Sequence, residues 1–89
     1  MDKLLLNPIR LKIISTLLGV SSCDFNHLQK VTESSKGNLS VQLKKLEESK
    51  YILISKSFKN NYPNTSCSIT KLGSKRFEDF FKSLMSLRK

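Results

Sequence analysis

The stretch SSKGNLSVQLKKLEES, from Ser34 to Ser49, is the part of the chain that best predicts the fold. It contains leucines at positions i, i+4 and i+7, the spacing that lines one face of an α-helix. These are Leu39, Leu43 and Leu46. Ser34 or Ser35 can cap this helix, because a serine oxygen accepts hydrogen bonds from the free N–H groups of the first turn. Nearly every other position is charged or small and polar, so the opposite face is predicted to be exposed.

Two helices are predicted before this stretch. Asn7 can cap the first, Pro8 fits its first turn, and its apolar stripe ends at Gly19. Asp24 can cap a short second helix, which stops in the polar turn at residues 32–35. The side chains of this second helix that are predicted to face inward are Phe25, Leu28 and Val31.

A β-hairpin is predicted after the third helix. Residues 51–59 are rich in β-favouring side chains, and residues 60–64 have the composition of a turn. Residues 65–70 resume a strand in which Cys67 and Ile69 alternate with polar side chains. The hairpin therefore covers residues 51–70, and its tip is expected to be loose.

The last predicted helix, residues 71–88 with Thr70 as its cap, has an apolar stripe that is too wide for one small core. We expect part of this stripe to pack on a second subunit, together with leucines of the N-terminal extension, residues 1–6. The candidate dimer contacts are Leu4, Leu5, Phe77, Phe80, Phe81, Leu84 and Leu87.

The length and charge of the chain limit what it can do. At 89 residues it is expected to form a single domain, and a domain of this size hides only about 60% of the surface of its unfolded chain. The net charge is +9, and 12 of the 16 Lys and Arg residues follow Ser35, so an anionic partner is expected. Asn7 and Pro8 break the N-terminal leucine run, and no apolar run approaches the ~20 residues of a membrane span. We therefore expect a cytoplasmic protein with no membrane partner.

The predicted order of three helices, a hairpin and a further helix is that of a mainly α fold with a β-hairpin wing, a winged helix-turn-helix. The segments NPIRLKIISTLL, GNLSVQLKKLEESKYI and SITKLGSKRF resemble winged-helix transcriptional regulators of the MarR and ArsR type, especially the small single-domain group. The resemblance covers residues 7–81. It implies a homodimer that lays the third helix of each subunit in successive major grooves of double-stranded DNA, with each wing against the backbone or the minor groove.

Two features depart from the resemblance. Lys50 stands where relatives commonly have a helix-ending glycine, a residue that adopts the left-handed conformation more easily. The wing tip carries asparagines where relatives often have Arg or Lys, which leaves Lys56 and Lys59 as its nearby charges. The grip of the wing on phosphates is therefore expected to be weak.

The exposed face of the third helix has side chains suited to DNA. Its first turns contain Gly37 and small side chains, which permit close approach to a major groove. Asn38 can form a bidentate pair with adenine, whereas Lys44 and Lys45 suit phosphates or guanine edges. The candidate DNA-binding residues are Ser35, Lys36, Gly37, Asn38, Ser40, Val41, Lys44, Lys45, Lys56, Lys59 and Asn61.

No enzyme, metal site or cofactor is expected. His27 is the only histidine and stands in no recognisable nucleophile motif, and no glycine-rich phosphate loop is present. Cys23, Asp24 and His27 could meet at a helix start, but capping by Asp24 is favoured, because the cysteine cluster of metal-sensing regulators is missing. Cys23 and Cys67 are interpreted as small, partly buried apolar residues.

The expected function is sequence-specific binding of promoter DNA by a homodimer. A protein-docking module and charge-driven coating of nucleic acid without sequence preference are the alternatives. Lys56 and Lys59 could equally keep an exposed strand edge soluble, and Arg10 and Lys12 are interpreted as ordinary surface charges. Whether a small-molecule effector exists is left open.

Overall fold

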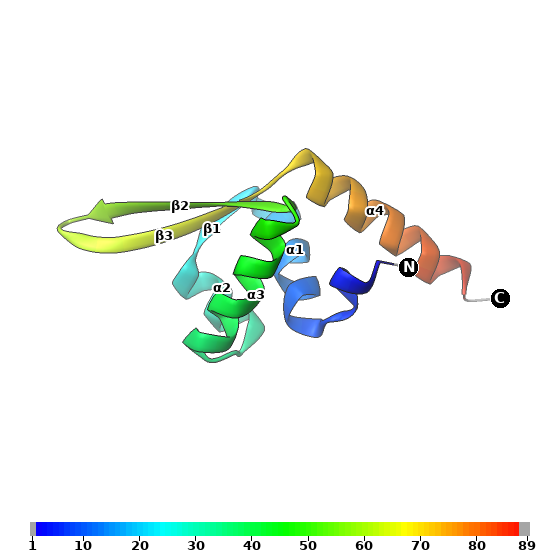
Figure 1. The fold of residues 1–89 in the computed structure, drawn as a ribbon, viewed down its shortest axis with the longest axis horizontal. Coiled ribbons are helices and arrows are strands. Elements are labelled where there is room, and N and C mark those ends of the chain that lie inside the picture. The colour runs from blue at the N-terminus through cyan, green and yellow to red at the C-terminus, as the bar shows by residue number, and fades with distance from the viewer. Residues whose placement is uncertain (1, 88–89) are drawn as a thin grey trace.

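The computed structural model describes residues 2–87, so Met1 of the predicted extension and Arg88 of the predicted last helix lie outside it. In chain order the elements are the 3₁₀-helix η1 (Lys3–Leu6), α1 (Pro8–Val20), β1 (Ser22–Asp24), α2 (Phe25–Thr32), α3 (Lys36–Glu48), β2 (Ile52–Lys59), β3 (Tyr62–Ile69) and α4 (Lys71–Ser86). The first three α-helices form the body, the β2–β3 hairpin extends from it as a wing, and α4 leaves in the opposite direction (Figure 1). This arrangement confirms the predicted winged helix-turn-helix.

Each α-helix begins directly after the residue that the sequence predicts as its cap. The caps are Asn7, Asp24, Ser35 and Thr70. In each of them a side-chain oxygen accepts hydrogen bonds from first-turn N–H groups at 2.8 to 3.1 Å. Ser34 is the alternative that fails as the cap of α3, because its Oγ lies 2.7 Å from Thr32 Oγ1. The first helix ends at Val20, one residue beyond the predicted Gly19.

Apolar side chains from η1, the four α-helices and the sheet meet in one core. Its buried members are Leu5, Ile13, Ile14, Leu17, Leu28, Leu39, Leu43, Leu46, Tyr51, Ile52, Cys67 and Phe80. The three leucines of α3 are thereby confirmed as its inner face. Val31 is exposed and not inward-facing as predicted, because Thr32 takes the inner position of the last turn of α2. The Thr32 hydroxyl donates a hydrogen bond to the Leu28 carbonyl at 2.7 Å, so its burial leaves no polar group unpaired.

The N-terminal extension is part of the core. Leu5 in η1 is fully buried within the single chain, and Phe80 in α4 is nearly so. Neither side chain offers surface to a second subunit, so the predicted dimer contacts are corrected at these two positions. Leu4 and Phe77 are partly buried against the core, which leaves part of each side chain exposed.

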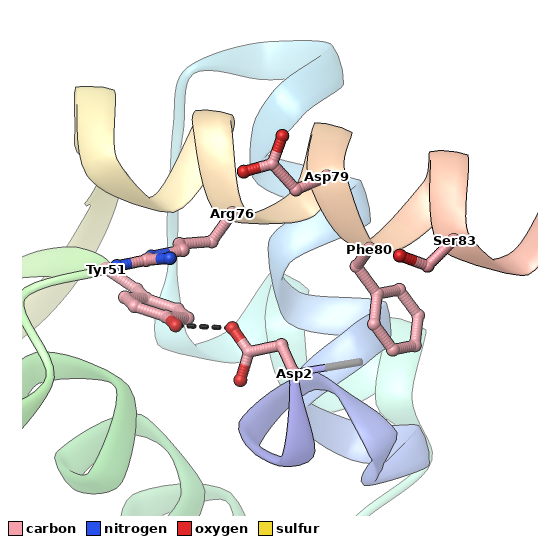
Figure 2. Close-up of a pocket in the computed structure, with 6 residues that line it drawn as sticks. All are labelled: Asp2, Tyr51, Arg76, Asp79, Phe80 and Ser83. Atoms are coloured by element: carbon pink, nitrogen blue, oxygen red, sulfur yellow. Dashed lines mark hydrogen bonds between the residues drawn. The ribbon is translucent and has the colours of Figure 1, made fainter.

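A cleft of about 310 Å³ lies between the start of η1 and α4 (Figure 2). It is lined by Asp2, Tyr51, Arg76, Asp79, Phe80 and Ser83. The Tyr51 hydroxyl donates a hydrogen bond to Asp2 Oδ2, and Asp2 Oδ1 accepts one from the Leu4 N–H at 2.9 Å. Burial first, and the hydrogen bond and charge of Asp2 second, raise the pKa of Tyr51 to about 12 against the opposing charge of Arg76. One tyrosine thus joins the N-terminus to the start of the wing.

The sheet has three antiparallel strands in the order β1-β3-β2. The strand β1, in which Ser22–Asp24 pairs with β3, was not predicted from the sequence. A strand of three residues is too short to reveal itself by alternation. Cys23 lies directly opposite Cys67 in this pairing, and both thiols are free.

The wing is tighter than predicted. Asn60 and Asn61 form a two-residue turn with φ of 53° and 67°, and β2 and β3 stay paired up to it. Left-handed φ at both central residues matches the twist of the flanking strands, and asparagine tolerates this conformation. The loose tip predicted at residues 60–64 is therefore wrong, since residues 62–64 belong to β3.

Candidate nucleic-acid interface

The N-terminal half of α3 presents a low, exposed surface. A Cβ atom added to Gly37 would meet no atom within 4 Å, and Asn38 and Ser40 are exposed. Val41 is 51% exposed, although it is apolar. The lysines of the helix are exposed as well: Lys36, Lys44 and Lys45. Small side chains followed by cations suit the close approach and the negative charge of a DNA groove.

A groove of about 590 Å³ lies between this helix and the wing. Its lining residues are Phe25, Ser40, Leu43, Lys44, Glu47, Ile54, Lys56 and Thr65. The structure thus brings together three of the predicted DNA-binding residues, Ser40 and Lys44 from α3 and Lys56 from β2. The carboxylate of Glu47 in the same groove offsets part of the lysine charge.

The other predicted wing residues lie apart from this groove. Lys59 follows Lys56 by three positions on β2, and because side chains alternate along a strand, it belongs to the opposite face of the hairpin. Asn61 lies in the turn with a left-handed backbone. Both residues are exposed, and neither is among the residues that line the groove.

Two residues behind the exposed face were not anticipated from the sequence. Arg10 is not an ordinary surface charge, because its Nε donates a hydrogen bond to the Leu4 carbonyl at 2.6 Å and its Nη1 donates one to Gln42 Oε1. Gln42 Nε2 in turn donates a hydrogen bond to Asn38 Oδ1 at 3.0 Å. The sequence could have indicated Gln42 by its position directly before Leu43, at the border of the apolar face of α3. In the structure Gln42 is only 9% exposed.

Of the three side chains that raised the possibility of metal binding, that of Asp24 has a structural role. Asp24 caps α2, as predicted, by accepting a hydrogen bond from the His27 N–H at 2.8 Å. Burial, with a smaller contribution from Asp24, raises the pKa of the Cys23 thiol, and burial raises that of Cys67 to about 11. Within residues 2–87, no three His, Cys, Asp or Glu side chains gather where they could hold a metal ion. No helix in the same range is long and apolar enough to cross a membrane.

The fold and the exposed third helix agree with a known family of proteins. Residues 9–87 match the model of the family described as a winged helix DNA-binding domain. The chain belongs to this family. The predicted winged-helix resemblance is thereby confirmed, whereas the narrower MarR or ArsR type stays a prediction.

Relatives of this winged-helix domain cover nearly its whole length. An uncharacterized protein from Methanocaldococcus jannaschii is 32% identical over 87 residues, which are 98% of this chain and 95% of the relative. A solved transcriptional regulator homologue from Pyrococcus horikoshii OT3 has a TM-score of 0.89 at 30% identity, with 97% of this chain and 85% of that chain covered. A putative transcriptional regulator from Thermoplasma acidophilum has a TM-score of 0.76 at 24% identity, over 98% and 88% of the two chains, and supports the fold alone.

Proposed function

We propose that this winged-helix domain is a homodimeric transcriptional regulator that binds double-stranded DNA in a sequence-specific manner. The observation that carries the proposal is the exposed face of α3, which offers a low polar surface at Gly37, Asn38 and Ser40. In a helix-turn-helix protein this is the part of the helix that enters the major groove. The transcriptional regulator homologue that is 30% identical to this chain supports the same proposal.

Base contacts and phosphate contacts come from different residues. Asn38, Ser40 and Val41 extend from the first turns of α3 and are the residues that read base edges. Lys44 and Lys56, on the two sides of the groove between α3 and the wing, bind the DNA backbone and set the position of the helix. Regulation then follows from occupancy of promoter DNA and requires no chemical step.

A second copy of the chain covers the apolar side chains at the C-terminal half of α4. These side chains are 38 to 69% exposed in the single chain: Phe81, Leu84, Met85 and Leu87. The Phe81 ring stacks on that of Phe77, with ring centroids 6.4 Å apart, so the two rings contribute to one apolar surface. Because α4 extends away from the body (Figure 1), the same face of two copies can meet around a two-fold axis.

Selection from a random duplex library at near-physiological salt tests this function. We expect the retained fragments to contain an inverted repeat whose half-site centres are about one helical turn, 10 to 10.5 base pairs, apart. Retention without a common motif would contradict sequence specificity and favour charge-driven coating. No retention at all would contradict DNA binding and favour a protein-docking module.

A further inference from the structure

A row of hydrogen-bonded side chains connects the body of the protein to the exposed face of α3. Arg10 of α1 is held by the Leu4 carbonyl, donates to Gln42 Oε1, and Gln42 Nε2 donates to Asn38 Oδ1. The middle residue is 9% exposed, whereas Asn38 at the end of the row is exposed. An exposed amide is therefore oriented by groups beneath it.

The direction of every hydrogen bond in this row is fixed by its first residue. A guanidinium has only donors and stays charged at any pH at which proteins are folded. Gln42 must therefore turn its oxygen to Arg10, which leaves its NH₂ group for Asn38. Asn38 can meet an NH₂ group only with its oxygen, so both donors of its own NH₂ group are left for a ligand, whereas its oxygen keeps only one of its two lone pairs.

We infer that Arg10 and Gln42 are positioning residues that make Asn38 a reader of hydrogen-bond acceptors on DNA bases. This inference rests on the proposed function, and it names the chemistry that one base position must have. Guanine offers the acceptors N7 and O6 in the major groove, and thymine offers O4. Cytosine offers only the N4 donor, whereas adenine offers both N7 and N6, and its bidentate pair uses the Asn38 NH₂ group together with the remaining lone pair of the oxygen. Asn38 therefore prefers guanine or thymine to cytosine, and the adenine pair expected from the sequence is compatible with this orientation.

The substitution Gln42→Glu reverses the direction of the hydrogen bond between residues 42 and 38. The size of the side chain stays almost the same. A carboxylate at neutral pH only accepts, so it takes one hydrogen bond from Arg10 and requires a second donor from Asn38. The Asn38 amide then turns over and presents its oxygen to the DNA. We expect the preferred base at that position to change from guanine or thymine to cytosine.

The readout is the ratio of bases at one position in fragments selected from the same library. That position is the one at which Asn38→Ala loses selectivity. We expect the ratio of guanine and thymine to cytosine to change by about tenfold or more between the wild type and Gln42→Glu. The added negative charge weakens binding to all duplexes alike, so it does not change this ratio. Asn26→Asp, the same chemical change at an exposed amide of α2, should leave the preference unchanged.

Two further variants test whether Arg10 orients the Gln42 amide through its hydrogen bond or only fills the space beside it. Arg10→Lys keeps a donor opposite Gln42 and should retain the wild-type base preference, whereas Arg10→Met frees both amides and should abolish selectivity at this position without reversing it. Loss of selectivity in Arg10→Lys would indicate that the arginine acts by shape alone and would overturn the inference. All variants are compared by their thermal midpoints.

A measurement on the wild type without DNA keeps the inference testable if a variant does not fold. In hydrogen exchange followed by NMR, the side-chain amide protons of Gln42 should exchange more slowly than those of Asn38. The reverse order would overturn the inference. A wild type that selects no motif overturns the proposed function, whereas a wild type and a Gln42→Glu variant that select the same base overturn only this inference.

Discussion

Gly19 and Gly37 are both helical and exposed, and a Cβ atom added to either would meet nothing within 4 Å. Alanine at either position should raise the free energy of unfolding by up to about 1 kcal/mol, because it restricts the unfolded chain. Only Gly37 lies on the face that approaches DNA. We expect Gly37→Ala to lower DNA affinity about tenfold in a titration, since the added methyl group holds the helix away from the bases. Gly19→Ala should bind DNA with the affinity of the wild type. Equal DNA affinities of the two variants would mean that the DNA does not approach α3 at Gly37.

Tyr51 makes stability depend on alkaline pH. Its pKa of about 12 in the folded protein lies above the ordinary value of about 10, so folding favours the neutral phenol. The resulting stabilisation is complete below pH 10 and is lost as the pH rises through about 12. Its full loss amounts to on the order of 2 kcal/mol. We expect the urea midpoint to fall more steeply between pH 10 and 12 in the wild type than in Tyr51→Phe.

Lysine deprotonation in the same pH range affects both of these chains and does not contribute to the difference between them. Parallel curves for the wild type and Tyr51→Phe would show that the contact with Asp2 gives no preference for the neutral phenol. At neutral pH, where the phenol is protonated, Tyr51→Phe loses only the hydrogen bond to Asp2, worth about 1 kcal/mol.

The structural role of a residue could be predicted from the sequence where its hydrogen-bond partner is close in the chain. It could not be predicted where the partner is distant. The four helix caps bond to N–H groups two or three positions away, and local rules are sufficient to find them. Lys50 has φ of 64°, as expected from its place where relatives have glycine. Arg10 was misjudged because its partner Gln42 is 32 positions away and becomes a neighbour only when α1 packs on α3.

At the scale of elements, α4 can dock only because residue 73 has no side chain. A Cβ atom at Gly73 would lie 2.2 Å from the Tyr51 carbonyl oxygen and 3.2 Å from Ile69 Cγ1, so the helix itself would have to move. We expect Gly73→Ala to lower the free energy of unfolding by about 1 to 3 kcal/mol in urea titrations, despite the better helix propensity of alanine. Gly19→Ala is the control, since it makes the same change in open space. A midpoint for Gly73→Ala as high as that of the control would mean that α4 adjusts freely.

The type of each long element was predictable, but short strands and turn boundaries were not. The helices show apolar spacing over several turns, and the hairpin shows two runs of β-favouring residues. In contrast, β1 becomes a strand only by pairing with β3. Pro63 suggested a longer turn, yet it fits in β3 because β1 covers that strand only at residues 66–68 and leaves one edge free beyond them.

At the scale of the whole molecule, the proposed DNA-binding and dimerisation surfaces occupy different parts of the structure. The wing and α4 extend in opposite directions from the three-helix body, and the described residues measure 53 × 25 × 21 Å (Figure 1). The sequence predicted that part of the stripe on α4 would remain uncovered, because its apolar residues exceed what one small core holds. Which of them remain exposed depended on how α4 packs against α1, since Phe80 turns into the core and Phe81 does not.

The exposed part of α4 leads to a prediction about assembly. Phe81 is 51% exposed on α4, and Phe58 is 78% exposed on the wing, so a glutamate at either position adds a charge at little cost to folding. In sedimentation equilibrium we expect a wild-type mass near twice the chain mass of 10.2 kDa, and a mass near that of one chain for Phe81→Glu. A dimer holds both half-sites of an inverted repeat at once, so Phe81→Glu should bind the full repeat roughly 100-fold more weakly while its affinity for a single half-site is unchanged. Phe58→Glu should remain a dimer, and dissociation of both variants, or a wild type that stays a monomer at high concentration, would contradict a dimer built on α4.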